Sequence, residues 1–257
     1  MNKIIILVLL LLASGDAGAK VVAPDEYGKV IIANYSERAG LAPVVFDHWV
    51  HRARYTCRLC HIDIGFAMAK SATSITAAAN RKGLYCGTCH NGKRTYNGKT
   101  IFASCSETIQ QKNAACERCH SLQRSRVQGQ DFKSFLETMP RNSSGNGIDW
   151  EAAESSGRIK PIDFLEGVSI QRPRLTAQKD FVINAMGTGN DAVVFSHKKH
   201  AVWNGCEVCH PDIFPIKKGA AKYTMHEIER GEYCGVCHDK VAFPILDCKR
   251  CHKGGGK

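Results

Sequence analysis

The sequence predicts a mostly irregular chain with small helices and minor β-hairpins, organised as two tandem units of related sequence. Two observations predict this class. Outside the apolar N-terminus, no long segment of the 257-residue chain has the hydrophobic periodicity of a helix or a strand, so regular elements are expected to be short. In addition, a compact cysteine motif recurs in two separate parts of the chain, which indicates an internal duplication.

The N-terminus has the features of a cleavable export signal. Lys3 is followed by an apolar run from Ile4 to Ala13 and by the small-residue tripeptide Ala17-Gly18-Ala19. The run is too short to cross a bilayer, and an Ala-x-Ala site is typical of signal-peptidase cleavage. We expect residues 1–19 to be a signal peptide, with an uncleaved anchor as the alternative. The mature chain is then expected in the periplasm or associated with the outer surface, without a transmembrane segment.

Twelve of the 13 cysteines belong to six Cys-x-x-Cys-His motifs. Cysteines at i and i+3 and a histidine at i+4 share one face of a helix, so the two sulfurs can capture the vinyl groups of haem while the imidazole binds its iron. The sequence therefore predicts six covalently bound haem c groups. The attachment cysteines and proximal histidines are Cys57, Cys60 and His61; Cys86, Cys89 and His90; Cys116, Cys119 and His120; Cys206, Cys209 and His210; Cys234, Cys237 and His238; and Cys248, Cys251 and His252.

Other uses of cysteine fit this spacing less well. A disulfide framework, the default for an exported cysteine-rich chain, does not require a histidine after every second cysteine. A thioredoxin-like pair needs one Cys-x-x-Cys in a βαβ setting, and a zinc site pairs two such units or adds a distant pair of histidines. The formal charge of +11 would ordinarily suggest nucleic acid. Six haems bring about twelve propionates, however, so we expect the basic residues to serve the cofactors and no nucleic acid to bind.

The motifs fall into two groups of three, separated by a long segment without cysteine. This segment is rich in turn-forming residues, notably over 140–147, and is interpreted as a linker. We therefore expect a first triheme domain over residues 20–120, a linker over 121–192 and a second triheme domain over 193–257.

Two further segments repeat in both units. A Phe-x-His-x-x-His segment precedes the first motif of each unit, at 46–51 and 195–200, and a Gly-x-Tyr-Cys-Gly-x-Cys-His segment follows. Short β-prone runs at Val30–Ala33 and Val193–Phe195 are expected to form a small hairpin or edge strands ahead of the paired histidines. Haem is expected to make most of the core, because domains of this size bury little apolar protein surface.

These repeats resemble the triheme cytochrome c7 type, a shortened relative of tetraheme cytochrome c3. The run Phe214-Pro215-Ile216-Lys217-Lys218-Gly219, then Thr224-Met225, then Tyr233-Cys234-Gly235, is similar to the triheme repeat of the extended "nanowire" cytochromes of metal-reducing bacteria. The resemblance covers about residues 45–120 and 193–253. It leaves out the linker and the mature N-terminus.

The resemblance implies a second axial ligand for four of the irons. In the family pattern, the first histidine of Phe-x-His-x-x-His binds the first haem of its unit, and the second histidine binds the second haem. Carried over to this chain, the pairs are His48 with His61, His51 with His90, His197 with His210, and His200 with His238.

The third haem of each unit needs a different ligand. In the second unit, Met225 and His226 are adjacent, so only one is expected to reach the iron, and the similar repeats favour Met225 over His226. In the first unit, Ala77 and Ala78 occupy the matching positions.

Two methionines remain as candidates for the haem of His120. Met68 is the nearest spare ligand, and Met139 in the linker is the next. Cys105 belongs to no motif and is expected to be buried and inert, with intermolecular pairing as the alternative.

The expected function is to carry electrons and not to transform a substrate, because an iron with two protein ligands exchanges electrons through the haem edge. The resemblance implies redox partners, such as a quinol-oxidising membrane complex as donor and a terminal metal or cytochrome as acceptor, in anaerobic respiration or extracellular electron transfer. One alternative is a multihaem reductase of an oxyanion such as nitrite or sulfite, acting at an open third haem of the first unit. Another is a structural haem subunit of a membrane or filament complex.

Overall fold

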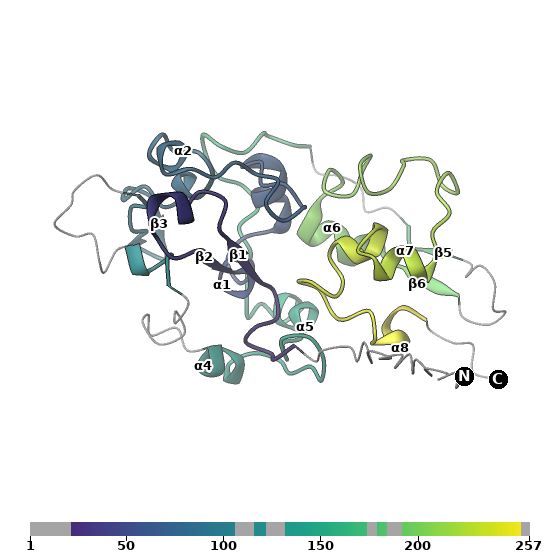
Figure 1. Ribbon diagram of the computed structural model, residues 1–257. Coiled ribbons are helices and arrows are strands. Elements are labelled where there is room, and N and C mark those ends of the chain that lie inside the picture. The colour runs from purple at the N-terminus through teal and green to yellow at the C-terminus, as the bar shows by residue number, and fades with distance from the viewer. Residues whose placement is uncertain (1–21, 106–115, 122–131, 174–178, 184–191, 253–257) are drawn as a thin grey trace, which may run out of the picture.

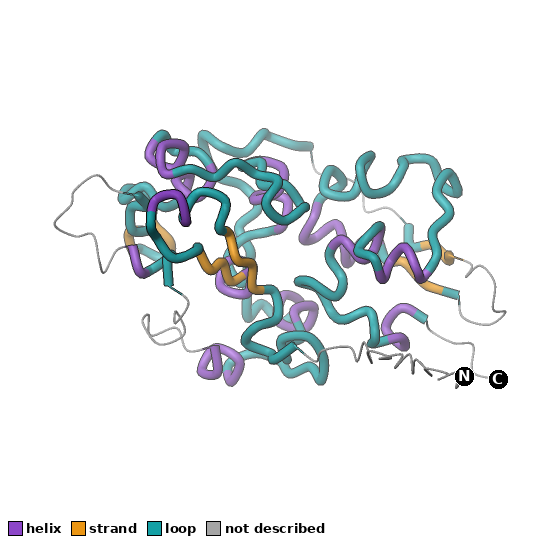
Figure 2. Tube along the Cα trace, viewed as in Figure 1, coloured by secondary structure: helices purple, strands orange, loops and turns teal. Residues whose placement is uncertain are grey.

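The computed structural model describes residues 22–105, 116–121, 132–173, 179–183 and 192–252. The predicted signal peptide lies outside these residues. Short helices and three antiparallel strand pairs are joined by long stretches of turn and loop, as Figures 1 and 2 show. The predicted class, small helices with minor β-hairpins, is confirmed. In the described part of the chain, no helix has the length and apolar character needed to cross a membrane.

The strand pairs place the paired histidines. Val30–Ala33 was expected to be β, and strand β1 runs over Lys29–Ile32; it pairs with β2, Val44–Asp47. The other expected strand is β6, Val193–Phe195, which pairs with β5, Phe181–Ile183. Strands β2 and β6 lead directly into the helices that carry the histidine pairs, α1 over His48–Arg52 and α6 over His197–Asn204. A third pair joins β3, Thr95–Tyr96, to β4, Lys99–Thr100.

In each unit, a short helix packs in the same way against the start of the second haem motif. Helix α2, Ala77–Arg81, and helix α7, Met225–Glu229, are both capped by a threonine whose hydroxyl accepts a backbone N–H, from Ala79 and Glu227 respectively. Each helix packs on a 3-10 turn that holds the motif's first cysteine, over Tyr85–Thr88 and Tyr233–Val236.

This close packing of helix and motif requires the glycine of Cys-Gly-x-Cys-His. A Cβ atom on Gly87 would lie 1.8 Å from the carbonyl oxygen of Asn80, and one on Gly235 would lie 1.9 Å from that of Ile228. No side chain can fit at either position. The helix therefore approaches the motif about equally closely in both units.

The segment interpreted as a linker is structured where the structure describes it. It contains helix α4, Phe132–Glu137, and helix α5, Trp150–Ser155. The turn-forming run between them closes a tight loop, in which Arg141 bridges to Ile148 and the Asn146 side chain accepts a hydrogen bond from the indole of Trp150. The turn residues therefore connect two helices within this segment, an arrangement that sequence composition alone does not distinguish from a flexible linker. The boundaries 20–120, 121–192 and 193–257 remain predictions.

A cluster of buried apolar side chains joins this segment to both units. Trp49 comes from α1 of the first unit, Trp203 from α6 of the second and Trp150 from α5. The rest of the buried cluster is Ile148, Ala153 and Ile159.

Ion pairs cross the same boundary. Arg172 donates to Asp63 in the first unit at 2.6 Å and to Glu207 in the second unit at 2.5 Å. In addition, Arg58, inside the first haem motif, pairs with Asp163 of the intervening segment. Aromatic packing and charge thus hold the three parts of the chain together.

Candidate haem-binding sites

The attachment motifs adopt the helical turn that their spacing predicts. In five of the six, the backbone N–H of the histidine donates to the carbonyl oxygen of the first cysteine at 2.8–3.0 Å. An i to i+4 bond of this kind brings both cysteines and the histidine to one face. The histidines with this bond are His90, His120, His210, His238 and His252.

In most of the histidines proposed as ligands, one ring nitrogen is hydrogen-bonded to the backbone. In eight histidines, Nδ1 lies 2.7–3.2 Å from a backbone carbonyl oxygen. A carbonyl can only accept, so Nδ1 must carry the proton and Nε2 keeps its lone pair for a metal. This is the arrangement that a haem ligand needs, and it fixes the direction of each ring. The eight residues are His48, His51, His61, His120, His197, His200, His210 and His238.

Two histidine pairs have the spacing of rings on opposite sides of one iron. The ring centres of His51 and His90 are 6.3 Å apart, and those of His200 and His238 are also 6.3 Å apart. Two metal–nitrogen bonds of about 2 Å, plus about 1.1 Å from each nitrogen to its ring centre, require about 6.2 Å. Both pairs therefore leave room for one iron.

A phenylalanine orients the distal ring in each pair. Phe46 stacks on His51 with a centre separation of 4.4 Å, and Phe195 stacks on His200 at the same separation. Each phenylalanine also meets the first histidine of its segment edge-on, at 4.8 Å for His48 and 5.0 Å for His197. The phenylalanine of Phe-x-His-x-x-His thus contacts both ligands that follow it.

Burial keeps these imidazoles neutral. The pKa of His48 is lowered to about 4 chiefly by burial, although its bond to the Gly28 carbonyl acts in the opposite direction. Burial likewise lowers the pKa of His238 to about 4. A neutral imidazole is the form that binds a metal, so these rings are ready for iron at neutral pH.

The attachment sulfurs form a continuous series through the molecule. Burial is the main reason that the pKa of Cys60 is raised to about 12, and the neighbouring Cys89, Cys57 and Cys86 raise it further. Once haem is attached, these sulfurs are thioethers and no longer titrate, but charges influence one another more strongly the closer they lie, so these influences indicate which motifs are neighbours. The series joins Cys119 to Cys86, Cys86 to Cys60, Cys57 to Cys209 and Cys237, and Cys234 to Cys251.

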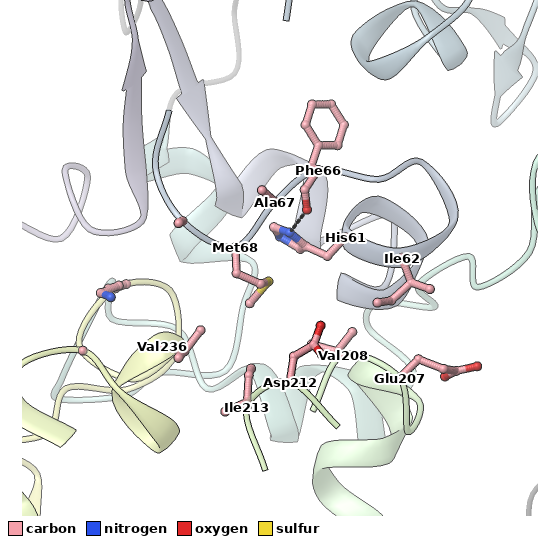
Figure 3. A pocket seen from close by; sticks show the side chains of 13 residues that line it. His61, Ile62, Phe66, Ala67, Met68, Glu207, Val208, Asp212, Ile213 and Val236 are labelled. Carbon is pink, nitrogen blue, oxygen red and sulfur yellow. Dashed lines mark hydrogen bonds between the residues drawn. The ribbon is translucent and has the colours of Figure 1, made fainter. Parts of the chain in front are cut away.

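A cavity of about 510 Å³ lies beside His61, a size typical of cofactor sites. It is lined from the first unit by His61 and Met68 and from the second by Val208, Ile213 and Val236, among others. Figure 3 shows Met68 projecting into it between His61 and Val236. The structure therefore brings Met68 to the first haem motif and to the boundary between units.

The other candidates for the third haems are dispersed. His120 lies against the Ala42 carbonyl, while Met139 packs against the aromatic cluster around Trp49. The described contacts bring neither Met68 nor Met139 to His120.

In the second unit, Met225 is the first residue of α7 and is 44% exposed, and His226 follows it. Cys105, for which sequence reasoning found no role, lies beside the equivalent helix of the first unit. The amide nitrogen of the Asn80 side chain is 3.7 Å from its sulfur.

Sequence reasoning missed Arg52, the residue after His51. Its guanidinium lies against the rings of both Trp150 and Trp203, at 4.6 and 4.9 Å from their centres. No local sequence pattern identifies this half-buried arginine, because the two indole rings come from segments far away in the sequence.

Clusters of three or more His, Cys, Asp or Glu side chains able to hold a metal ion are absent from the described residues. The repeated attachment turns, the imidazoles with Nε2 available and the two ring pairs thus define a multihaem c-type cytochrome.

The sequence profile described as "Cytochrome c7 and related cytochrome c" matches residues 44–121 and 193–253, more than half of the chain. The protein belongs to this family. The matched regions agree with the resemblance expected over about 45–120 and 193–253.

Solved structures are also similar to the chain. The C-terminal hexaheme fragment of GSU1996 is 25% identical, covering 88% of this chain and 96% of that one, with a TM-score of 0.27. The N-terminal hexaheme fragment of GSU1996 is 24% identical over 88% and 98%, with a TM-score of 0.25. Comparison with curated proteins returns no match.

Proposed function

We propose that this protein is a six-haem c-type cytochrome that carries electrons between redox partners outside the cytoplasm. The main support for this proposal comes from two histidine pairs whose ring centres are 6.3 Å apart. Each pair has room for one iron, and a phenylalanine stacks on its distal ring. Bound haem supplies the one-electron chemistry. For the first two haems of each unit the protein supplies two nitrogen ligands, which would close the iron to substrates and leave electron exchange through the haem edge.

The series of sulfurs supports conduction along the whole chain. It runs from the third motif of the first unit, through the boundary between units, to the third motif of the second. An electron accepted at one end would then move from motif to neighbouring motif to the other end. We place the protein in the periplasm, between a quinol-oxidising membrane complex and a terminal metal or cytochrome acceptor, in anaerobic respiration or extracellular electron transfer.

The ligand assignment within this proposal follows the repeat. His48, His51, His197 and His200 serve as distal ligands of the first two haems of their units, and Met225 serves the last haem, with His226 as its alternative. Met68 is kept as the candidate for the haem of His120, although it lies beside His61.

Stopped-flow mixing with soluble ferric chelates tests the function. We expect the reduced holoprotein to be oxidised rapidly and completely, at a rate that rises linearly with chelate concentration, because ligated irons need no substrate site. Nitrite, sulfite and hydroxylamine should not be turned over. Saturable steady turnover of one of these compounds would instead support the reductase.

One observation keeps the reductase as the second candidate. Ala77 and Ala78 begin α2 where Met225 and His226 begin α7, so the haem of His120 lacks the ligand that its counterpart has. If that iron is open, reduced parent protein will bind carbon monoxide at one haem.

A further inference from the structure

Arg52 lies where the two triheme units meet. Besides its contacts with Trp150 and Trp203, its Nη1 donates to the carbonyl oxygen of Val241 at 2.7 Å. The N–H of Val241 in turn donates to the carbonyl oxygen of Cys237 at 3.0 Å. A first-unit arginine is therefore bonded to the loop that follows the second motif of the other unit.

The same arginine also adjoins a haem motif of its own unit. Cys57 packs against the buried cluster that contains Trp150 and Trp203, the two rings that the guanidinium contacts. The positive charge thus lies near two attachment sites that belong to different units, those of Cys57 and Cys237.

Nothing in the described protein neutralises this charge. Among the described residues, no carboxylate forms an ion pair with Arg52, and its Nε atom is shielded from water without a hydrogen-bond partner. Arg52 as a whole is half-buried. Arginine stays protonated in proteins, and shielding part of an unpaired charge from water is costly unless something negative compensates. The negative charge available here is what haem brings, namely its propionates and the electron added on reduction.

We propose that Arg52 is a potential-setting residue that favours the reduced state of the haems attached at Cys57 and Cys237. The proposal rests on the proposed electron-carrying function and goes further, because it identifies the boundary between units as the place where electrons are stabilised. A fixed positive charge attracts the electron that reduction adds. When the potentials of these two adjoining haems are raised together, an electron can pass from one unit to the other without moving to a haem of lower potential.

The test is a redox titration of the full holoprotein, followed haem by haem in its NMR spectrum. Arg52→Met removes the charge and keeps an unbranched side chain against the indole rings, and Arg52→Lys keeps the charge. Arg38→Gln is the matched control, since Arg38 also lies over an aromatic ring, that of Tyr35 at 5.8 Å, but is exposed.

In Arg52→Met we expect the reduced-to-oxidised ratio of two haems to fall about tenfold at a given potential, which is about 59 mV for one electron. Arg52→Lys and Arg38→Gln should leave these midpoints in place. Unchanged midpoints in Arg52→Met, or an equal shift in Arg52→Lys, would overturn the proposal. If methionine cannot pack, Arg52→Gln makes the same comparison with a smaller polar side chain. Failure to oxidise with ferric chelates would count against the carrier function, whereas the midpoint shifts judge Arg52 alone.

Discussion

Replacing His200 with alanine is expected to leave one haem iron without its distal ligand. The His200 ring is fixed by its Nδ1 bond to the Ser196 carbonyl at 2.8 Å and by stacking on Phe195, and its centre is 6.3 Å from that of His238. Without this imidazole, the iron on His238 becomes high-spin, and the reduced variant binds one more equivalent of carbon monoxide than the parent. Absorbance spectroscopy during a carbon monoxide titration measures both changes.

Lys198→Ala provides the control for this substitution. Lys198 lies on the same helix between the two ligand histidines, and its side chain is exposed. Its removal should change neither the spin state nor the carbon monoxide stoichiometry. Should the His200 variant bind no more carbon monoxide than the parent, His200 is not a ligand and the 6.3 Å spacing has another cause.

Replacing Trp150 with alanine is expected to destabilise the whole molecule. Trp150 is only 7% exposed, donates its indole N–H to Asn146 at 3.2 Å and contacts Arg52 and Trp203. Removing a buried tryptophan of this kind typically lowers the free energy of unfolding by about 3–5 kcal/mol. Because Trp150 lies between the units, the contact between them should loosen as well. Denaturation in guanidinium chloride, followed by far-ultraviolet circular dichroism, gives the change in stability.

Ile216→Ala is the matched control for the loss of an apolar side chain. Ile216 is 81% exposed, so its truncation should alter the free energy of unfolding by no more than about 0.5 kcal/mol. A loss below about 1 kcal/mol for Trp150→Ala would mean that the segment 132–163 is a linker after all, with little role in holding the units together.

The attachment chemistry could be predicted from sequence because it is local. Two thioethers and a proximal ligand must come from five consecutive residues, so the six motifs are visible without any knowledge of the fold. The strands ahead of the histidine pairs were also predictable, since Val30–Ala33 and Val193–Phe195 are rich in residues that favour strands. Both regions lie in β-hairpins, although their partner strands were not identified.

The contacts between units could not be predicted, because they join residues distant in the chain. Arg52 reaches Val241 across 189 positions, and the carbonyl that orients His120 comes from Ala42, 78 positions away. Turn formers at 140–147 look the same in a flexible linker and in a tight connection between packed helices. Only the burial of Trp150 reveals which of the two is present.

The measurement that tests the central claim most directly is the intact mass of the mature protein, expressed with the machinery that attaches haem c. We expect the mass of a chain beginning at Lys20 plus six haem increments that survive denaturation, because each haem is held by two thioethers. Alanine at both Cys234 and Cys237 should remove one increment and leave five. Fewer than six increments in the parent, or increments lost under denaturing conditions, would contradict a six-haem cytochrome.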